Sequence, residues 1–87
     1  MKILNTAPSL GEMIHELYLT PTQLSIEEAA ALCQIDSALF NKIVNDQHRI
    51  GYELAYRLGK GFNTSHQFWL NLQQDYLKSQ AMVEQEQ

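Results

Sequence analysis

Two short amphipathic segments separated by only a few residues are the feature that most restricts the fold of this 87-residue chain. The first segment opens at Ser25, a good helix N-cap with Glu28 three residues on, and continues over residues 26–33. After a break of three or four residues, Asp36 or Ser37 caps the second segment. Two short helices joined this closely must meet at a steep angle, which is the helix-turn-helix arrangement.

The side chains around this break fit a helix-turn-helix. Ala30 is the small residue that the inner face of the first helix needs, and Ile35 is an apolar residue that points inward from the turn. The buried side of the second helix is predicted at Phe40, Ile43 and Val44. Its solvent side carries short or hydrogen-bonding side chains able to reach base edges: Ser37, Ala38, Asn41, Lys42 and Asn45. Two core helices with a polar outer face would show the same pattern, so the pattern alone leaves both interpretations open.

A further helix is predicted before this pair. Ser9 and Glu12 form a capping-box pair, and apolar residues then repeat at helical spacing as far as Leu19. Pro21 is expected to end this helix, because proline lacks the backbone N–H that a helix interior requires.

Two more helices are predicted after the polar loop at 45–49. One covers roughly Gly51 to Lys60, with Gly59 or Gly61 as its C-terminal stop. Thr64 or Ser65 caps the last helix. No segment alternates with period two over strand length. We therefore expect an all-α fold of five helices in a single domain over residues 1–87, with an N-terminal arm at 1–8, a helical core at 9–78 and a C-terminal tail at 79–87.

The last helix carries two apolar stripes. Phe68, Trp69, Leu72 and Tyr76 lie along one side, and large aromatic residues at helical spacing usually pack into a core. A second, offset stripe is formed by Leu70, Leu77 and Ala81. If the domain fills the first side, the second is left for a partner, and we expect a dimer contact there.

The distribution of charge favours a nucleic-acid partner more than the net charge of −4 suggests. Residues 1–36 hold one basic and five acidic side chains, whereas residues 37–60 hold four basic and two acidic ones. Binding to phosphates depends on local cations, so the middle of the chain can serve this purpose. The acidic flanks predict modest affinity.

The composition gives no support for an enzyme or a metal centre. Cys33 is the single cysteine and lies in an apolar helical stretch, so a buried, inert thiol is expected. His15, His48 and His66 show no metal-ligand spacing with it. There is no glycine-rich phosphate loop, no nucleophile–base pair and no apolar run of membrane-spanning length. We expect a cytoplasmic, non-enzymatic protein without a cofactor.

Four blocks of the sequence resemble the Xre-type, lambda-repressor-like DNA-binding domains, and among them the HigA antitoxins. These blocks are Leu10-Gly11-Glu12-Met13-Ile14, Leu24-Ser25, the stretch from Tyr52 to Gly59, and the stretch from Phe62 to Tyr76. The last block, with Thr64-Ser65 leading to Phe68-Trp69-Leu70-Asn71-Leu72-Gln73 and Tyr76, is the most specific.

The resemblance implies a homodimer that binds operator DNA as a repressor and, for an antitoxin, also binds and silences a HigB-like ribonuclease toxin. It places the recognition helix at residues 37–45 and adds Leu39 to its DNA-contacting side chains. It also places Gln47, His48 and Arg49 in a loop that faces phosphates.

The chain departs from the family pattern at four positions. Gln34 and Asp46 stand where glycine is usual. Gln34 must therefore either adopt a left-handed backbone or change the turn slightly, and aspartate at residue 46 is among the residues that tolerate a left-handed backbone best after glycine. Asp46 is also expected to bring negative charge close to the phosphate contact. Ile26 and Leu39 replace polar residues of the DNA face. These departures leave a second hypothesis open, in which the fold serves as a protein-interaction module with weak or lost DNA binding.

Overall fold

The computed structural model describes the backbone of residues 7–85 and the side chains of residues 7–81, so the first six residues of the expected arm lie outside the described residues. The chain opens with one continuous helical run formed by α1 (Leu10–Ile14), the π-helical segment η1 (His15–Leu19) and α2 (Thr20–Thr22). The predicted capping box is present: the Glu12 N–H donates to Ser9 Oγ at 3.1 Å, and the Ser9 N–H donates to Glu12 Oε1 at 2.8 Å.

The prediction that Pro21 ends this helix is wrong. The run continues through Pro21 and ends at Gln23, which has a left-handed backbone with φ of 57°. Pro21 lies in the first turn of α2, directly after the π-helical segment, where the Thr20 N–H donates to the carbonyl of His15. A π-type turn is wider than an α turn and leaves room for the proline ring, which would clash with a carbonyl in a regular helix interior.

The predicted helix pair forms as α3 (Ile26–Cys33) and α4 (Ser37–Val44). Ser25 caps α3 with the expected capping box, and Asp36 caps α4 by accepting from the N–H groups of Ala38 and Leu39. Within the described residues the remaining elements are also helical and no strand forms, which confirms the all-α prediction.

The last two helices, α5 (Tyr52–Phe62) and α6 (His66–Gln85), are longer than predicted. Neither Gly59 nor Gly61 stops α5, which ends at Asn63 in the left-handed region with φ of 60°. Ser65 accepts from the Phe68 N–H at 3.1 Å at the start of α6, as one of the two predicted caps. Helix α6 continues to Gln85, past residue 78, so most of the expected tail is helical.

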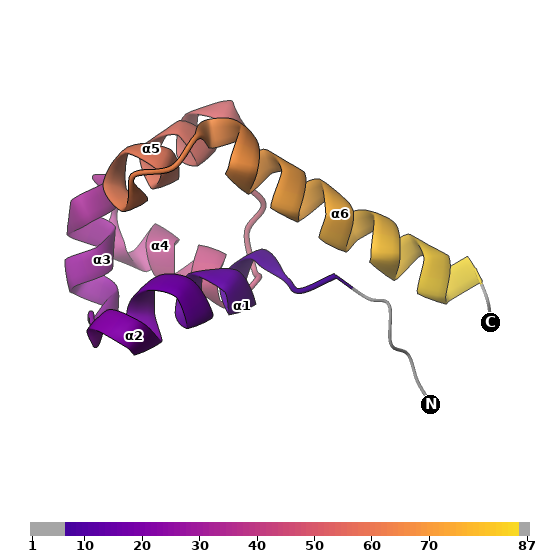
Figure 1. The fold of residues 1–87 in the computed structure, drawn as a ribbon, viewed down its shortest axis with the longest axis horizontal. Coiled ribbons are helices and arrows are strands. Elements are labelled where there is room, and N and C mark those ends of the chain that lie inside the picture. The colour runs from indigo at the N-terminus through magenta and orange to yellow at the C-terminus, as the bar shows by residue number, and fades with distance from the viewer. Residues whose placement is uncertain (1–6, 86–87) are drawn as a thin grey trace.

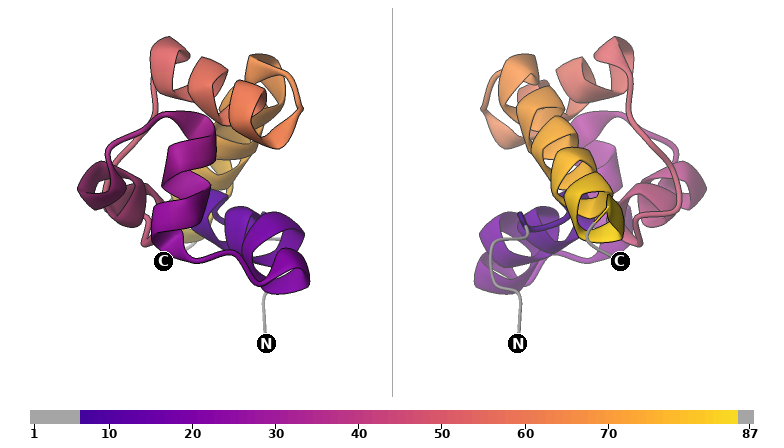
Figure 2. Two further views of the ribbon diagram at one scale, coloured as in Figure 1. Left: turned by 90° about the vertical axis from the view of Figure 1, so that its left-hand side faces the viewer. Right: turned by 90° about the vertical axis from the view of Figure 1, so that its right-hand side faces the viewer.

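The helices enclose one core around Trp69, Phe40, Ile14, Ile43 and Leu58, which are fully buried. Figure 1 shows α6 running away from the body formed by the other helices, and Figure 2 shows α4 and the α1–α2 run on opposite sides of α3 with α5 above them. The Tyr18 ring stacks on Phe62 at 4.1 Å between centroids, which joins the first helical run to the end of α5. None of the described helices is long and apolar enough to cross a membrane.

Two glycines of α5 permit close approach of the chain rather than ending the helix. A Cβ at Gly61 would meet Cys33 Sγ at 2.5 Å and Cys33 Cα at 2.7 Å. A Cβ at Gly59 would meet the Thr64 carbonyl oxygen at 2.8 Å. Both residues lie at ordinary helical φ, so their value is the missing side chain, which lets α3 and the α5–α6 turn pack against α5.

We predict that Gly61→Ala lowers the free energy of unfolding by about 3 kcal/mol, because the added methyl group overlaps the α3 backbone as well as a side chain. Gly51→Ser is the matched control: a Cβ there meets nothing within 4 Å, and serine is a good N-cap for α5, so stability should hold or rise slightly. Urea denaturation measures both. Equal stability of Gly61→Ala and wild type would contradict this account of the helix contact.

The buried thiol gives a second prediction. Cys33 is 1% exposed, and burial raises its pKa to about 12. Because the thiolate is the nucleophile, iodoacetamide at pH 8 should modify the native chain only as fast as it unfolds, and urea should accelerate the reaction by orders of magnitude. The ordinary thiol pKa is near 8.5, so stability should fall as pH rises from about 9 towards 12. Rapid labelling of the folded protein would show that Cys33 is accessible.

Candidate nucleic-acid interface

The outer surface of α4 is exposed along its length. Ser37, Ala38, Asn41, Lys42 and Asn45 are all exposed. Beneath them Phe40, Ile43 and Val44 are buried, and Ala30 and Ile35 pack at the turn as predicted. The one exception is Leu39, which the resemblance adds to the DNA face: it is half-buried and packs against the core, so only part of its side chain can meet a ligand.

Two amides on this surface are held together. Asn45 Nδ2 donates to the Asn41 carbonyl at 2.9 Å and to Asn41 Oδ1 at 3.3 Å. The pair fixes the orientation of the Asn41 side chain and leaves its NH₂ group directed to solvent as a donor. A positioned amide of this kind can pair with a base edge in a major groove.

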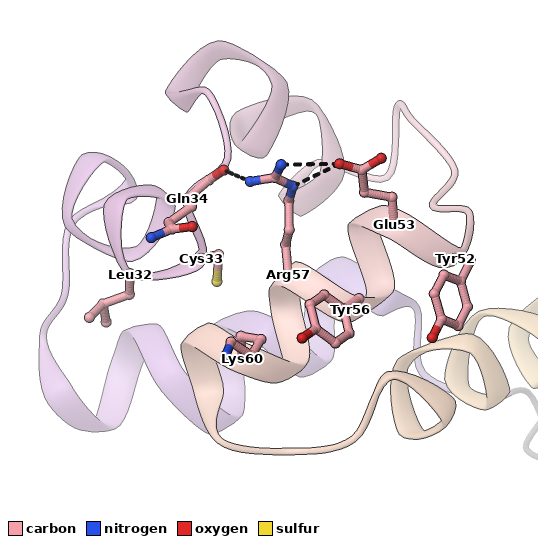
Figure 3. Close-up of a pocket in the computed structure, with 8 residues that line it drawn as sticks. All are labelled: Leu32, Cys33, Gln34, Tyr52, Glu53, Tyr56, Arg57 and Lys60. Carbon is pink, nitrogen blue, oxygen red and sulfur yellow. Dashed lines mark hydrogen bonds and ion pairs between the residues drawn. The ribbon is translucent and has the colours of Figure 1, made fainter.

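The turn between α3 and α4 is fixed from outside by Arg57. Gln34 has a left-handed backbone with φ of 56°, which was one of the two alternatives predicted for it. Its carbonyl oxygen accepts from Arg57 Nη1 at 2.7 Å, and the same guanidinium pairs with Glu53 at 3.0 Å (Figure 3). Arg57 therefore acts as a positioning residue of the helix-turn-helix. From the sequence it was predicted only to contribute to the positive charge of residues 37–60.

The other end of α4 is fixed by Asp46. Its backbone is left-handed, with φ of 60°, as predicted. The carboxylate accepts from Ser9 Oγ at 2.7 Å and from the Gly11 N–H at 3.0 Å, at the N-terminus of α1. The carboxylate is therefore hydrogen-bonded at a helix N-terminus, where negative charge is favourable. Asp46 also lines a cavity together with His48 and Arg49, so the expectation that its charge lies close to the phosphate contact stays a prediction.

The loop after α4 presents three exposed side chains, Gln47, His48 and Arg49. Ile50 anchors the loop in the core, and Gln73 of α6 holds it by two hydrogen bonds: the Ile50 N–H donates to Gln73 Oε1 at 2.8 Å, and Gln73 Nε2 donates to the Ile50 carbonyl at 2.9 Å. The side-chain amide of Gln73 thus pairs with both backbone polar groups of Ile50 and sets the position of the loop. The sequence placed Gln73 in the family block without assigning this role.

Besides its N-cap Asp36, a second acidic residue, Glu27, lies beside the start of α4. Ile26, Glu27, Ser37, Ala38 and Asn41 together line a shallow depression. Ile26 takes no part in polar contacts, and Glu27 is exposed beside the surface of α4. A phosphate approaching this end of the surface would meet a carboxylate.

The residues of the predicted dimer contact differ in their surroundings. Leu70 is half-buried and packs against the core. Leu77 is half-buried beside a cavity of about 200 Å³ that Leu10, His48 and Arg49 also line. Ala81 is exposed. Part of this stripe is therefore already filled by the domain.

Comparison with known proteins agrees with this geometry. No protein-family model matches the chain. An HTH-type transcriptional regulator of Haemophilus influenzae is 40% identical over 65 residues, which cover 75% of this chain and 61% of that regulator. The chain thus spans about three fifths of that relative. The virulence-associated protein I of Dichelobacter nodosus is 35% identical over 83% of this chain and 68% of its own length.

Solved structures extend the comparison. PA4674 of Pseudomonas aeruginosa in complex with its operator DNA has a TM-score of 0.81 at 32% identity, covering 90% of this chain and 84% of that one. The Pseudomonas aeruginosa antitoxin HigA with the higBA promoter has a TM-score of 0.79 at 32% identity, covering 88% and 84%.

These likenesses define the class as helix-turn-helix transcriptional regulators. Within that class the chain belongs to the HigA-type family of Xre-like helix-turn-helix proteins.

The role of Gln73 gives a test of the interface. Gln73→Ala should lower the free energy of unfolding by about 2 kcal/mol, because it leaves the Ile50 N–H and carbonyl without their partner. Amide hydrogen exchange should rise at residues 47–50. The neighbouring Gln74 is exposed, so Gln74→Ala should change neither quantity. Unaltered exchange in the Gln73 variant would mean that other contacts hold the loop.

Proposed function

We propose that this protein is a dimeric operator-binding repressor that acts by binding rather than catalysis, and that it is the antitoxin of a HigBA-type toxin–antitoxin pair. The observation that carries the DNA-binding part is the exposed polar surface of α4, fixed by Arg57 before the helix and by Asp46 after it. The likeness to a protein solved with its operator supports the same interpretation.

In this proposal α4 lies in the major groove. An α-helix with its side chains is about 10–12 Å across, which fits the roughly 12 Å width of that groove. The Asn41 amide and the short side chains of Ser37 and Ala38 face the bases. Lys42 and Arg49 contact phosphates on either side, with Gln47 and His48 beside Arg49 on the same loop.

The electrostatics of the proposed complex are local. Of the four cations between residues 37 and 60, Arg57 pairs with Glu53, and Lys60 lines a groove between α3 and α5, away from the outer surface of α4. Lys42 and Arg49 therefore supply most of the positive charge near the proposed bases, and Glu27 opposes them. We expect weak non-specific binding and a shallow dependence on salt.

Dimerisation completes the proposal, because two symmetry-related recognition helices can bind two half-sites of a palindromic operator. We place the contact on α6 at Leu70, Leu77 and Ala81, where the half-buried leucines leave apolar surface to be covered. Silencing of a HigB-like ribonuclease would be a second binding activity of the same protein, and membership of the HigA-type family supports it.

The surroundings of α4 also favour a second candidate function. Glu27 beside Asn41, together with the half-buried Leu39, removes cationic and polar character from the DNA face. A protein-interaction module that has kept the fold and lost most DNA affinity would show these features.

Operator binding separates the two candidates. Lys42→Ala and Arg49→Ala should each weaken binding to the protein's own promoter region at every sequence tested, and each should reduce the salt slope by about one. Lys78→Ala, which removes an exposed lysine from α6, is the matched control and should bind as wild type. Gel-shift titrations at several salt concentrations measure all three.

The same titrations decide against DNA binding if wild type gives no shift at micromolar dimer and low salt. That result would favour the interaction module. A shift that ignores both Lys42→Ala and Arg49→Ala would instead mean that another surface contacts the phosphates.

A further inference from the structure

A groove lined by both apolar and charged side chains lies between α3 and α5, with a volume of about 490 Å³ (Figure 3). Leu32 of α3 forms one wall, while Tyr52, Tyr56 and Lys60 follow one another along α5. The groove holds neither the exposed side chains of α4 nor the loop after it. Its surface therefore has no part in the proposed contact with DNA.

Most of the exposed apolar side chains of the described residues gather at this groove. Four large hydrophobic residues are exposed among the described residues. Three of them line the groove: Leu32 at 52%, Tyr52 at 63% and Tyr56 at 47%. Tyr52 and Tyr56 lie side by side with centroids 6.4 Å apart, and His66, at the start of α6, meets Tyr52 edge-on at 4.7 Å. Exposed tyrosines and a leucine gathered at one groove with charged side chains beside them are typical of a protein-binding site.

The groove has one cation that is not paired with a carboxylate of the described chain. Glu53 is neutralised by Arg57 at 3.0 Å, and Arg57 is also bound to the Gln34 carbonyl. Lys60 Nζ lies 5.9 Å from the centre of the Tyr56 ring, and among residues 7–81 no carboxylate lies within ion-pair distance of it. The complementary occupant carries apolar side chains followed by acidic ones.

The chain contains such a segment at residues 82–87, where Met82 and Val83 precede Glu84 and Glu86 with no basic residue among them. Helix α6, with 20 residues, is about 30 Å long and leads away from the groove, so the backbone of residues 82–85 lies far from the groove of its own chain (Figure 1). In an antiparallel pair of α6 helices, however, the end of one helix lies beside the start of the other. The start of α6 is His66, which touches Tyr52 at the edge of the groove.

We propose that residues 82–87 of a second copy of this chain dock in the groove between α3 and α5, with Met82 and Val83 against Leu32 and Tyr56 and the acidic side chains beside Lys60. The exchange is reciprocal, so the pair closes with two-fold symmetry and leaves no groove open for further copies. This inference rests on the homodimer of the proposed function and specifies what covers the groove in it. The docked segment would also cover the Arg57–Gln34 contact that fixes the helix-turn-helix.

Sedimentation equilibrium on the whole protein tests the contact through a charge exchange. Deletion of residues 82–87 and Lys60→Glu should each raise the dimer dissociation constant at least tenfold. Lys60→Glu combined with Glu84→Lys and Glu86→Lys should restore it to within about threefold of wild type, because the ion pairs form again with reversed sign. Glu16→Lys, an exposed charge reversal on the first helical run that does not line the groove, is the matched control and should leave the dimer unchanged. Circular dichroism confirms that each variant is folded.

Operator gel shifts on the same variants keep this inference distinct from the proposed function. If the deletion leaves the dimer dissociation constant unchanged, the docking is overturned while operator binding stays in place. The same holds if the wild-type chain is monomeric and still binds the operator. Failure of the triple variant to recover also overturns it. A dimer that depends on Lys60 and residues 82–87 but never binds the operator supports the docking and contradicts the proposed function.

Discussion

Helix α4 keeps its orientation because the turn before it, at Gln34, and the residue after its C-cap, Asp46, are each left-handed and held by another element. Arg57 of α5 binds the Gln34 carbonyl before the helix, and Asp46 binds the start of α1 after it. A surface that reads DNA needs side chains whose positions are set before the ligand arrives. The core beneath α4 supplies the packing, whereas these polar contacts set the angle at which the helix is presented. The double hydrogen bond of Gln73 to Ile50 extends the same control to the loop.

Local sequence patterns predicted most of the fold. The capping boxes at Ser9 and Ser25 marked the starts of two helices, and α3 occupies the predicted residues. The errors lie at helix ends. Pro21 is accommodated because a π-type segment precedes it, and α5 passes through Gly59 and Gly61 because those glycines serve contacts with other parts of the chain. Such long-range contacts leave no periodic pattern in the sequence, so helix ends predicted from proline and glycine alone are misplaced.

The candidate site could be predicted at the level of which residues face outward on α4, since helical spacing alone decides this. What holds those residues in place could not be predicted. Arg57 and Gln73 have ordinary surface-type side chains, and their partners are 23 residues away in each case. The sequence predicted a negative charge at Asp46 but not its hydrogen bonds to Ser9 and Gly11, because these depend on where α1 begins in space. Tyr52 and Tyr56 of α5 belong to a block that resembles the family, but nothing in the sequence predicted that their side chains are exposed.

The four residues with left-handed backbone in the described chain are Gln23, Gln34, Asp46 and Asn63, and none of them is glycine. A non-glycine residue in this region costs on the order of 1 kcal/mol, so the ends of the helices together store several kcal/mol of strain. A domain of this size commonly has a total stability of about 4–13 kcal/mol. Strain at these four helix ends is therefore a sizeable fraction of the free energy that holds such a domain together.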